Sequence, residues 1–193
     1  MKRLLALLIL TQFVRAQPPS VVTRYCSGCH GIDGKSAPPY IPRLSGMGAA
    51  YLETRLRAFQ KSTAPPVDEI LPRKRSSGPG TTDMVGMTHV ISDQDLQAAA
   101  AWYASQTPAG GKHADSKTVE SGTSLFRACQ PCHGSDAHGT EDIPRLAGQN
   151  ARYIRTQLAW FRDGTRQSPA MAEVARHLDS DQVRALSLYL ESR

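Results

Sequence analysis

Aromatic residues are scarce in this chain, and long apolar runs are missing beyond its first residues. Aromatic side chains make up 6% of the 193 residues, and hydrophobic residues make up 40%. Past the N-terminus, no segment stays apolar over the roughly 20 residues that a membrane-spanning helix needs, so we expect no span in the mature chain. Domains with so few aromatic residues would have thin cores, and a large buried cofactor would supply the missing apolar volume.

The first 16 residues have the pattern of a secretory signal peptide. Lys2 and Arg3 precede an apolar run from Leu4 to Leu10, and the segment ends at Ala16. A charged start, a short apolar middle and a small residue at the end are typical of such signals. We expect cleavage after Ala16; an uncleaved anchor is the alternative, but the run is shorter than a bilayer span. About 177 residues then remain, enough for one domain or two small ones.

Four cysteines in an exported protein ordinarily suggest disulfides, but their spacing here points elsewhere. They form two Cys-x-x-Cys-His motifs, each followed by glycine. This pattern is typical of c-type haem attachment, in which two thiols bind the porphyrin and the adjacent histidine ligates the iron. A single motif of this kind could also be a zinc site or a redox thiol pair. The presence of two such motifs behind an export signal disfavours both alternatives. We expect two covalently bound haem c groups, attached at Cys26, Cys29, Cys129 and Cys132, with His30 and His133 as proximal iron ligands.

The positive charge of the sequence does not indicate a nucleic-acid partner. The formal net charge is +6, and removing Lys2, Arg3 and Arg15 with the signal peptide leaves about +3. Two haems add propionate carboxylates, which the oxidised irons offset only in part. The mature holoprotein would therefore be close to neutral, and the pI of 9.4 gives no case for nucleic-acid binding.

The two motifs belong to a longer internal repeat. Residues 42–46 match residues 144–148, and residues 51–56 match residues 153–158. In both copies apolar residues then recur at i, i+4 and i+7, which is one face of a helix. Each half therefore has an amphipathic helix after its attachment motif.

A matching last helix closes each half. Ser92 with Asp95, and Asp179 with Gln182, have the pattern of helix N-caps with a polar third-position partner. No strand pattern appears in either half, so we predict an all-α fold of two tandem haem domains. Pro108 and the glycines after it mark a linker between them. The predicted boundaries are 1–16 for the signal peptide, 17–107 for the first haem domain, 108–118 for the linker and 119–193 for the second haem domain.

The register of the repeat indicates a methionine as the sixth iron ligand in each half. Met171 is the sole methionine of the second half, and Met84 stands at the matching place in the first. Thioether sulfur suits haem iron and raises its potential. A lone methionine is more often a core residue, but the shared register favours ligation. Met87 is the chief rival of Met84, whereas Met47 comes too early in the chain.

Two prolines and three further histidines stand near these ligands in the sequence. Pro42 and Pro144 each follow a haem histidine by about a dozen residues. A carbonyl there would accept the imidazole N–H and fix the ring, with a plain turn as the alternative. His89, His138 and His177 are substitutes for a methionine ligand, but none recurs at an equivalent place, so we expect them at the surface or behind the ligands.

On these motifs the chain resembles the dihaem class I cytochromes c of the cytochrome c4 type, over nearly all of residues 20–193. The resemblance implies two cytochrome c folds about a pseudo-twofold axis, histidine and methionine ligation, and a periplasmic carrier of single electrons. It also implies the proline-to-histidine hydrogen bond. The short helix before Cys26 lacks counterparts of Gly122 and Phe126, so we expect the first domain to close less tightly.

Three functions fit this pattern. The first is a periplasmic carrier between a respiratory donor, such as a dehydrogenase or cytochrome complex, and a terminal oxidase. The second is the cytochrome subunit of a periplasmic dehydrogenase of the flavocytochrome type. A haem peroxidase is the third, disfavoured because both halves supply a methionine for the sixth position. We expect an electron carrier rather than an enzyme, with redox proteins as partners; peripheral association with a membrane stays open.

The first half also contains an insert of about fifteen residues between Phe59 and Met84. Its proline-rich part, 64–80, is interpreted as a surface loop. The basic run 73–75 within it is either a solvated charge run or a docking patch for an acidic partner.

Overall fold

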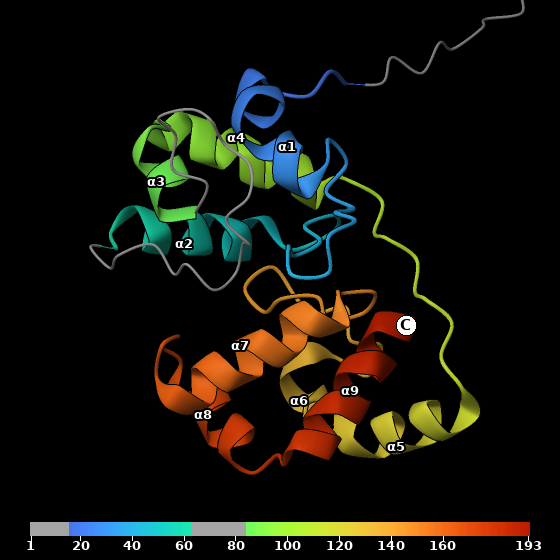
Figure 1. The fold of residues 1–193 in the computed structure, drawn as a ribbon. Helices are drawn as coiled ribbons and strands as arrows, with labels where there is room; N and C mark the ends of the chain where they lie inside the picture. Colours follow the sequence, from blue (N-terminus) through green and yellow to red (C-terminus); the bar gives the residue numbers. More distant parts are fainter. Residues whose placement is uncertain (1–15, 63–83) are drawn as a thin grey trace, which may run out of the picture.

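The computed structural model describes residues 16–62 and 84–193. The predicted signal peptide up to residue 15 and the proline-rich insert with its basic run lie outside the described residues. Within the described ranges all regular elements are helical (Figure 1), which confirms the predicted all-α class.

The two halves repeat one order of elements. The first half contains the π turn η1 Val22–Cys26 and the helices α1 Ser27–His30, α2 Ala49–Gln60, α3 Met84–His89 and α4 Asp93–Ala104. The second half contains α5 Ser116–Phe126, α6 Gln130–His133, α7 Ala151–Asp163, α8 Pro169–Arg176 and α9 Ser180–Ser192. The main difference is at the start, where the short η1 stands in place of the longer α5.

The predicted caps begin the last helix of each half. Ser92 Oγ accepts the Asp95 N–H at 3.2 Å at the start of α4. At the start of α9, Asp179 and Gln182 form a reciprocal capping box, with bonds of 2.8 and 3.0 Å. Each satisfies backbone N–H groups that a helix start leaves without partners. From these caps α4 runs to Ala104 and α9 runs to Ser192.

Amphipathic helices build a separate apolar core in each half. In α7 the predicted apolar face, Ile154, Leu158 and Phe161, is fully buried. In α2 Leu52 is buried, whereas Leu56 is only partly so. In the second half α5 packs against α9, and in the first half α2 packs against α4. The cores thus form around the middle and last helices, beside the attachment motifs.

The halves face each other across α2 and α7 (Figure 1) and exchange matched backbone hydrogen bonds. The Tyr51 N–H donates to the Glu141 carbonyl at 2.8 Å, and the Tyr153 N–H donates to the Pro39 carbonyl at 3.1 Å. Tyr51 and Tyr153 are equivalent in the repeat, and so are Pro39 and Glu141. A reciprocal exchange between equivalent residues is what a twofold axis produces, so the domains are related by a pseudo-twofold axis.

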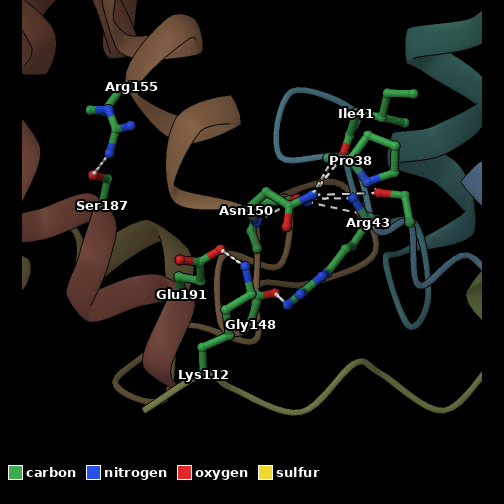
Figure 2. Close-up of polar contacts among 11 residues, drawn as sticks. Pro38, Ile41, Arg43, Lys112, Gly148, Asn150, Arg155, Ser187 and Glu191 are labelled. Carbon is green, nitrogen blue, oxygen red and sulfur yellow. Dashed lines mark hydrogen bonds and ion pairs between the residues drawn. The ribbon is translucent and has the colours of Figure 1, made fainter. Parts of the chain in front are cut away.

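The connection between the domains lies against both of them. The Ala109 N–H donates to Ser45 Oγ of the first domain at 3.2 Å, and the Lys112 N–H donates to the Glu191 carbonyl of α9 at 2.9 Å. Lys112 Nζ also pairs with the Glu191 carboxylate at 2.8 Å (Figure 2). α5 begins at Ser116, so the end of the segment expected as a linker is helical. These contacts fasten the connection to the domain pair.

Candidate haem-binding sites

Each Cys-x-x-Cys-His motif forms a short helical turn that ends at its histidine. α1 ends at His30 and α6 ends at His133. The glycines that follow, Gly31 and Gly134, have φ of 77° and 78°. Glycine adopts this conformation without a steric penalty, so the chain turns sharply after each histidine.

The two thiols of each motif differ in burial. Cys26 and Cys129 are half-buried, Cys29 and Cys132 are exposed, and all four are free of disulfides. Burial, with the neighbouring Cys29 as a smaller cause, raises the pKa of Cys26 to about 11. Burial likewise raises the pKa of Cys129. The attacking thiol of a redox pair needs a lowered pKa, and neither Cys26 nor Cys129 has one.

A zinc site lacks its ligands in the described part of the chain. No group of three or more His, Cys, Asp or Glu side chains comes close enough there to hold a metal ion. Structural zinc is held by four such ligands. Within the described ranges, neither motif therefore has the ligands of a structural zinc site.

His30 and His133 are both buried and both face a proline carbonyl. Their Nδ1 atoms lie 3.0 Å from the carbonyl oxygens of Pro42 and Pro144 respectively. A carbonyl only accepts, so Nδ1 carries the proton and Nε2 carries the lone pair. Burial lowers the pKa of both histidines, with the proline carbonyl opposing it. The rings are thus neutral imidazoles, the form that ligates a metal.

The candidate methionines lie on equivalent helices. Met84 begins α3 and Met171 lies in the first turn of α8. α3 packs against α2 and α8 packs against α7. Met87 shares α3 with Met84, so the choice between them stays a prediction. Met47 is buried at the domain interface, in a small pocket that it shares with the side chain of Gln149.

The three other candidate histidines lie at the surface. His89, His138 and His177 are all exposed. The His89 ring donates to the Val85 carbonyl at 2.7 Å, and the His177 ring donates to the Glu173 carbonyl at 2.8 Å. Both bonds turn the rings back along their own helices. The expectation of a surface location is confirmed.

Half-buried arginines at the domain interface suit a cofactor that carries carboxylates. Arg166 donates to Tyr51 across the interface at 3.0 Å, and its charge lies close to that of Arg55. The Nε atoms of Arg43 and Arg166 are buried without a hydrogen-bond partner among the described residues. Half-buried guanidinium groups with an unpaired N–H donor suit an anion, and the propionates of haem are carboxylates, so these residues fit the group.

Sequence reasoning missed these interface residues. Arg43 was visible only as part of a repeated segment, and nothing around Arg166 in the sequence distinguishes it. Asn150 was missed as well, although it is fully buried and reaches Pro38 and Ile41 of the other domain (Figure 2). A buried asparagine just before a helix carries no local signal of such a role.

Two helical domains, each with a thiol pair one turn from a buried neutral histidine, define a class of proteins that attach haem covalently. The family model for cytochrome c matches residues 19–107 and 119–193. The chain belongs to the cytochrome c family.

Relatives agree over most of the chain. Cytochrome c4 of Azotobacter vinelandii is 36% identical over 181 residues, which cover 86% of this chain and 83% of that protein. The crystal structure of reduced recombinant cytochrome c4 from Pseudomonas stutzeri aligns with a TM-score of 0.75 at 34% identity, covering 88% of this chain and 94% of that one. A thiosulfate dehydrogenase electron acceptor of Thiomonas intermedia is 29% identical over 195 residues, covering 92% of this chain and 82% of that protein.

These findings confirm the cofactor and the type of activity. The chain carries two covalently bound haem c groups and is an electron carrier, not an enzyme. When bound, each haem iron takes up and releases one electron. Among the helices of the described ranges, none has the length and apolar character of a membrane span.

Proposed function

We propose that this protein carries single electrons between redox proteins of the periplasm, with His30 and Met84 ligating the first haem iron and His133 and Met171 ligating the second. The observation that carries the ligand assignment is the pair of buried neutral histidines, each held by a proline carbonyl. That bond fixes the ring and leaves Nε2 as the metal-binding atom. The signal-peptide pattern supports export to the periplasm.

Electrons enter and leave at the exposed edges of the attachment motifs. Cys29 and Cys132 would each hold one edge of a haem, and both are exposed, so a partner could approach the attached group there. Ile32, just after the first motif, is 47% exposed, and Val90 is the other exposed large apolar residue of the described ranges. An apolar contact beside a haem edge suits the small, short-lived interfaces of electron-transfer partners. The donor is a dehydrogenase or cytochrome complex, and the acceptor is an oxidase.

A second candidate role is the electron-accepting cytochrome of one particular dehydrogenase. The Thiomonas intermedia relative, a thiosulfate dehydrogenase electron acceptor, aligns with nearly the whole chain and favours this role. Purification from the native host separates the two roles. A dehydrogenase that stays bound through purification supports the second role, and a protein recovered alone supports a free carrier.

Substitution of the methionines tests the ligands. Met84→Ala and Met171→Ala are each expected to remove the sulfur-to-iron charge-transfer band of one haem in the oxidised protein, because thioether ligation is lost at that iron. Mass spectrometry should still find two haems on each variant. Met87→Ala is the matched control on α3. If Met87→Ala removes the first-domain band and Met84→Ala does not, the first-domain assignment is wrong.

A further inference from the structure

The peptide unit between Pro42 and Arg43 is hydrogen-bonded at both ends, to different domains. Its carbonyl accepts the His30 Nδ1–H at 3.0 Å within the first domain. Its N–H donates to Gln149 Oε1 of the second domain at 2.9 Å. Both groups belong to one planar, conjugated amide, so a change at one end is felt at the other.

Gln149 is held in place for this contact. It is buried, and its Nε2 donates to the Arg43 carbonyl at 2.9 Å, so the amide side chain binds Arg43 on both sides. Its Oε1 also accepts the Asn150 N–H at 2.9 Å. The neighbouring contacts across the interface, from Arg43 to Gly148 and from Asn150 to Pro38, keep the two segments together (Figure 2).

Within residues 16–62 and 84–193, the second haem site has no such contact. Met47 is the counterpart of Gln149, since their N–H groups donate to the equivalent Leu44 and Leu146 carbonyls at 3.2 and 3.1 Å. A thioether is only a weak acceptor. Among the described contacts, no side chain of the first domain accepts the Arg145 N–H. The domain interface is therefore asymmetric at the two peptides that hold the haem histidines.

We propose that Gln149 lowers the reduction potential of the first-domain haem from across the domain interface, while the second-domain haem lacks an equivalent influence. An acceptor on the Arg43 N–H makes the Pro42 oxygen more negative, because hydrogen bonds in a chain polarise one another. The stronger bond to Nδ1–H makes His30 a more basic ligand, and a more basic ligand favours the oxidised iron. Gln149 is thus a positioning residue, and the inference rests on the proposed ligation by His30.

The consequence is that docking of the domains makes two similar haems unequal. With other influences equal, the first haem is the weaker oxidant, so an electron on it passes more favourably to the second. The direction of transfer within the molecule is then partly set by one amide side chain.

Exchange of the two equivalent residues tests the inference in the holoprotein. Gln149→Met is expected to raise the reduction potential of the first haem. At a fixed potential, the ratio of oxidised to reduced iron should change about threefold. This effect is smaller than the loss of a direct partner of a metal ligand. The second haem should not change. In the reduced protein the His30 Nδ1–H proton resonance should move upfield, because its hydrogen bond weakens. Met47→Gln should lower the second-haem potential.

Asn150→Ala serves as the comparison: it loosens the same interface but keeps the Gln149 side chain opposite the Arg43 N–H, so its first-haem shift should be smaller than that of Gln149→Met. Unchanged first-haem potential and Nδ1–H resonance in Gln149→Met would overturn the inference, and so would equal shifts at both haems or the same shift in Asn150→Ala. If Gln149→Met does not fold, Met47→Gln alone tests the inference. An unchanged second-haem potential in that variant would then overturn the inference. A wild-type spectrum without a histidine and methionine pair would instead refute the ligand assignment.

Discussion

Gly34 and Ala137 hold the same left-handed backbone at equivalent turns after the two haem histidines. Their φ values are 73° and 62°, and Ala137 is the one non-glycine residue with positive φ in the described ranges. At each turn the carbonyl accepts the leucine N–H of the Pro-Arg-Leu segment at 2.8 Å. A Cβ on Gly34 would lie 2.8 Å from the Tyr103 ring. Leu190 takes the place of Tyr103 in the second domain, since the Leu190 carbonyl accepts the Gly148 N–H as the Tyr103 carbonyl accepts the Gly46 N–H. The first domain therefore needs glycine here more than the second.

Substitution at these two positions is expected to have unequal effects. Gly34→Ala should lower the free energy of unfolding by about 2 kcal/mol, because left-handed strain adds to the overlap with Tyr103 and with the Ser45 backbone. Ala137→Gly should change it by less than about 1 kcal/mol, since relieved strain is offset by the greater freedom of glycine in the unfolded chain. Guanidinium unfolding of the holoprotein, followed by circular dichroism, measures both. Equal losses would contradict the steric argument.

α5 and α9 make the most extensive contact between elements that the structure describes, and a glycine makes their close packing possible. A Cβ on Gly122 would lie 2.0 Å from the Tyr189 Cβ. The Tyr189 ring packs against Phe126 with centroids 5.9 Å apart. The first domain has η1 in place of α5, and the buried residue of η1 is Val22. The second domain therefore has a close helix pair that the first domain lacks.

Gly122→Ala is expected to destabilise the second domain although alanine is the better helix former. Alanine gains about 1 kcal/mol of helix propensity, but overpacking against Tyr189 costs about 1–3 kcal/mol and the pair must move apart. Ser124→Ala is the matched control, because Ser124 is exposed on the same helix and should be neutral or slightly stabilising. Thermal unfolding of both variants makes the comparison. A stabilised Gly122→Ala would show that the helices separate at little cost.

At the scale of the whole molecule, the polar interface between the two domains is not symmetric. Asn150 is fully buried, and its Nδ2 donates to the carbonyls of Pro38 and Ile41 at 3.1 and 2.7 Å. Its counterpart in the first domain is Gly48, where a Cβ would lie 2.3 Å from the Glu141 carbonyl oxygen. Asn150 thus joins the domains through side-chain hydrogen bonds, whereas at Gly48 the backbones of the two domains come close together.

Loss of the Asn150 side chain should weaken the docking of the two domains. Asn150→Ala removes two hydrogen bonds between the domains, at a cost of about 2 kcal/mol, while the Ile41 carbonyl keeps the Ser36 hydroxyl as a donor. We expect the first domain to melt earlier than the second, so that calorimetry of the holoprotein shows a broadened or divided transition. Thr156→Ala on the exposed side of α7 is the control, because its hydroxyl bonds only within that helix. An unaltered Asn150→Ala transition would show that the amide contributes little to docking.

The sequence by itself determined the attachment motifs, the helical class and the helix starts. The first attachment motif lies within a single turn, so the spacing of Cys26, Cys29 and His30 alone predicts haem attachment. The caps at Ser92 and Asp179 are equally local, since an N-cap bonds to the third residue of its own helix. The repeat added the relation between the halves, because equivalent residues perform equivalent tasks in both.

The tertiary structure alone decided how the domains act on each other. Gln149 and Arg43 stand 106 residues apart, and Asn150 and Pro38 stand 112 apart. Their contacts arise only when two complete domains pack, and no periodicity or spacing encodes which polar side chain meets which carbonyl. The replacement of Met47 by Gln149 between the repeats is visible in the sequence. Its meaning is not, because the peptide that Gln149 bonds belongs to the other domain.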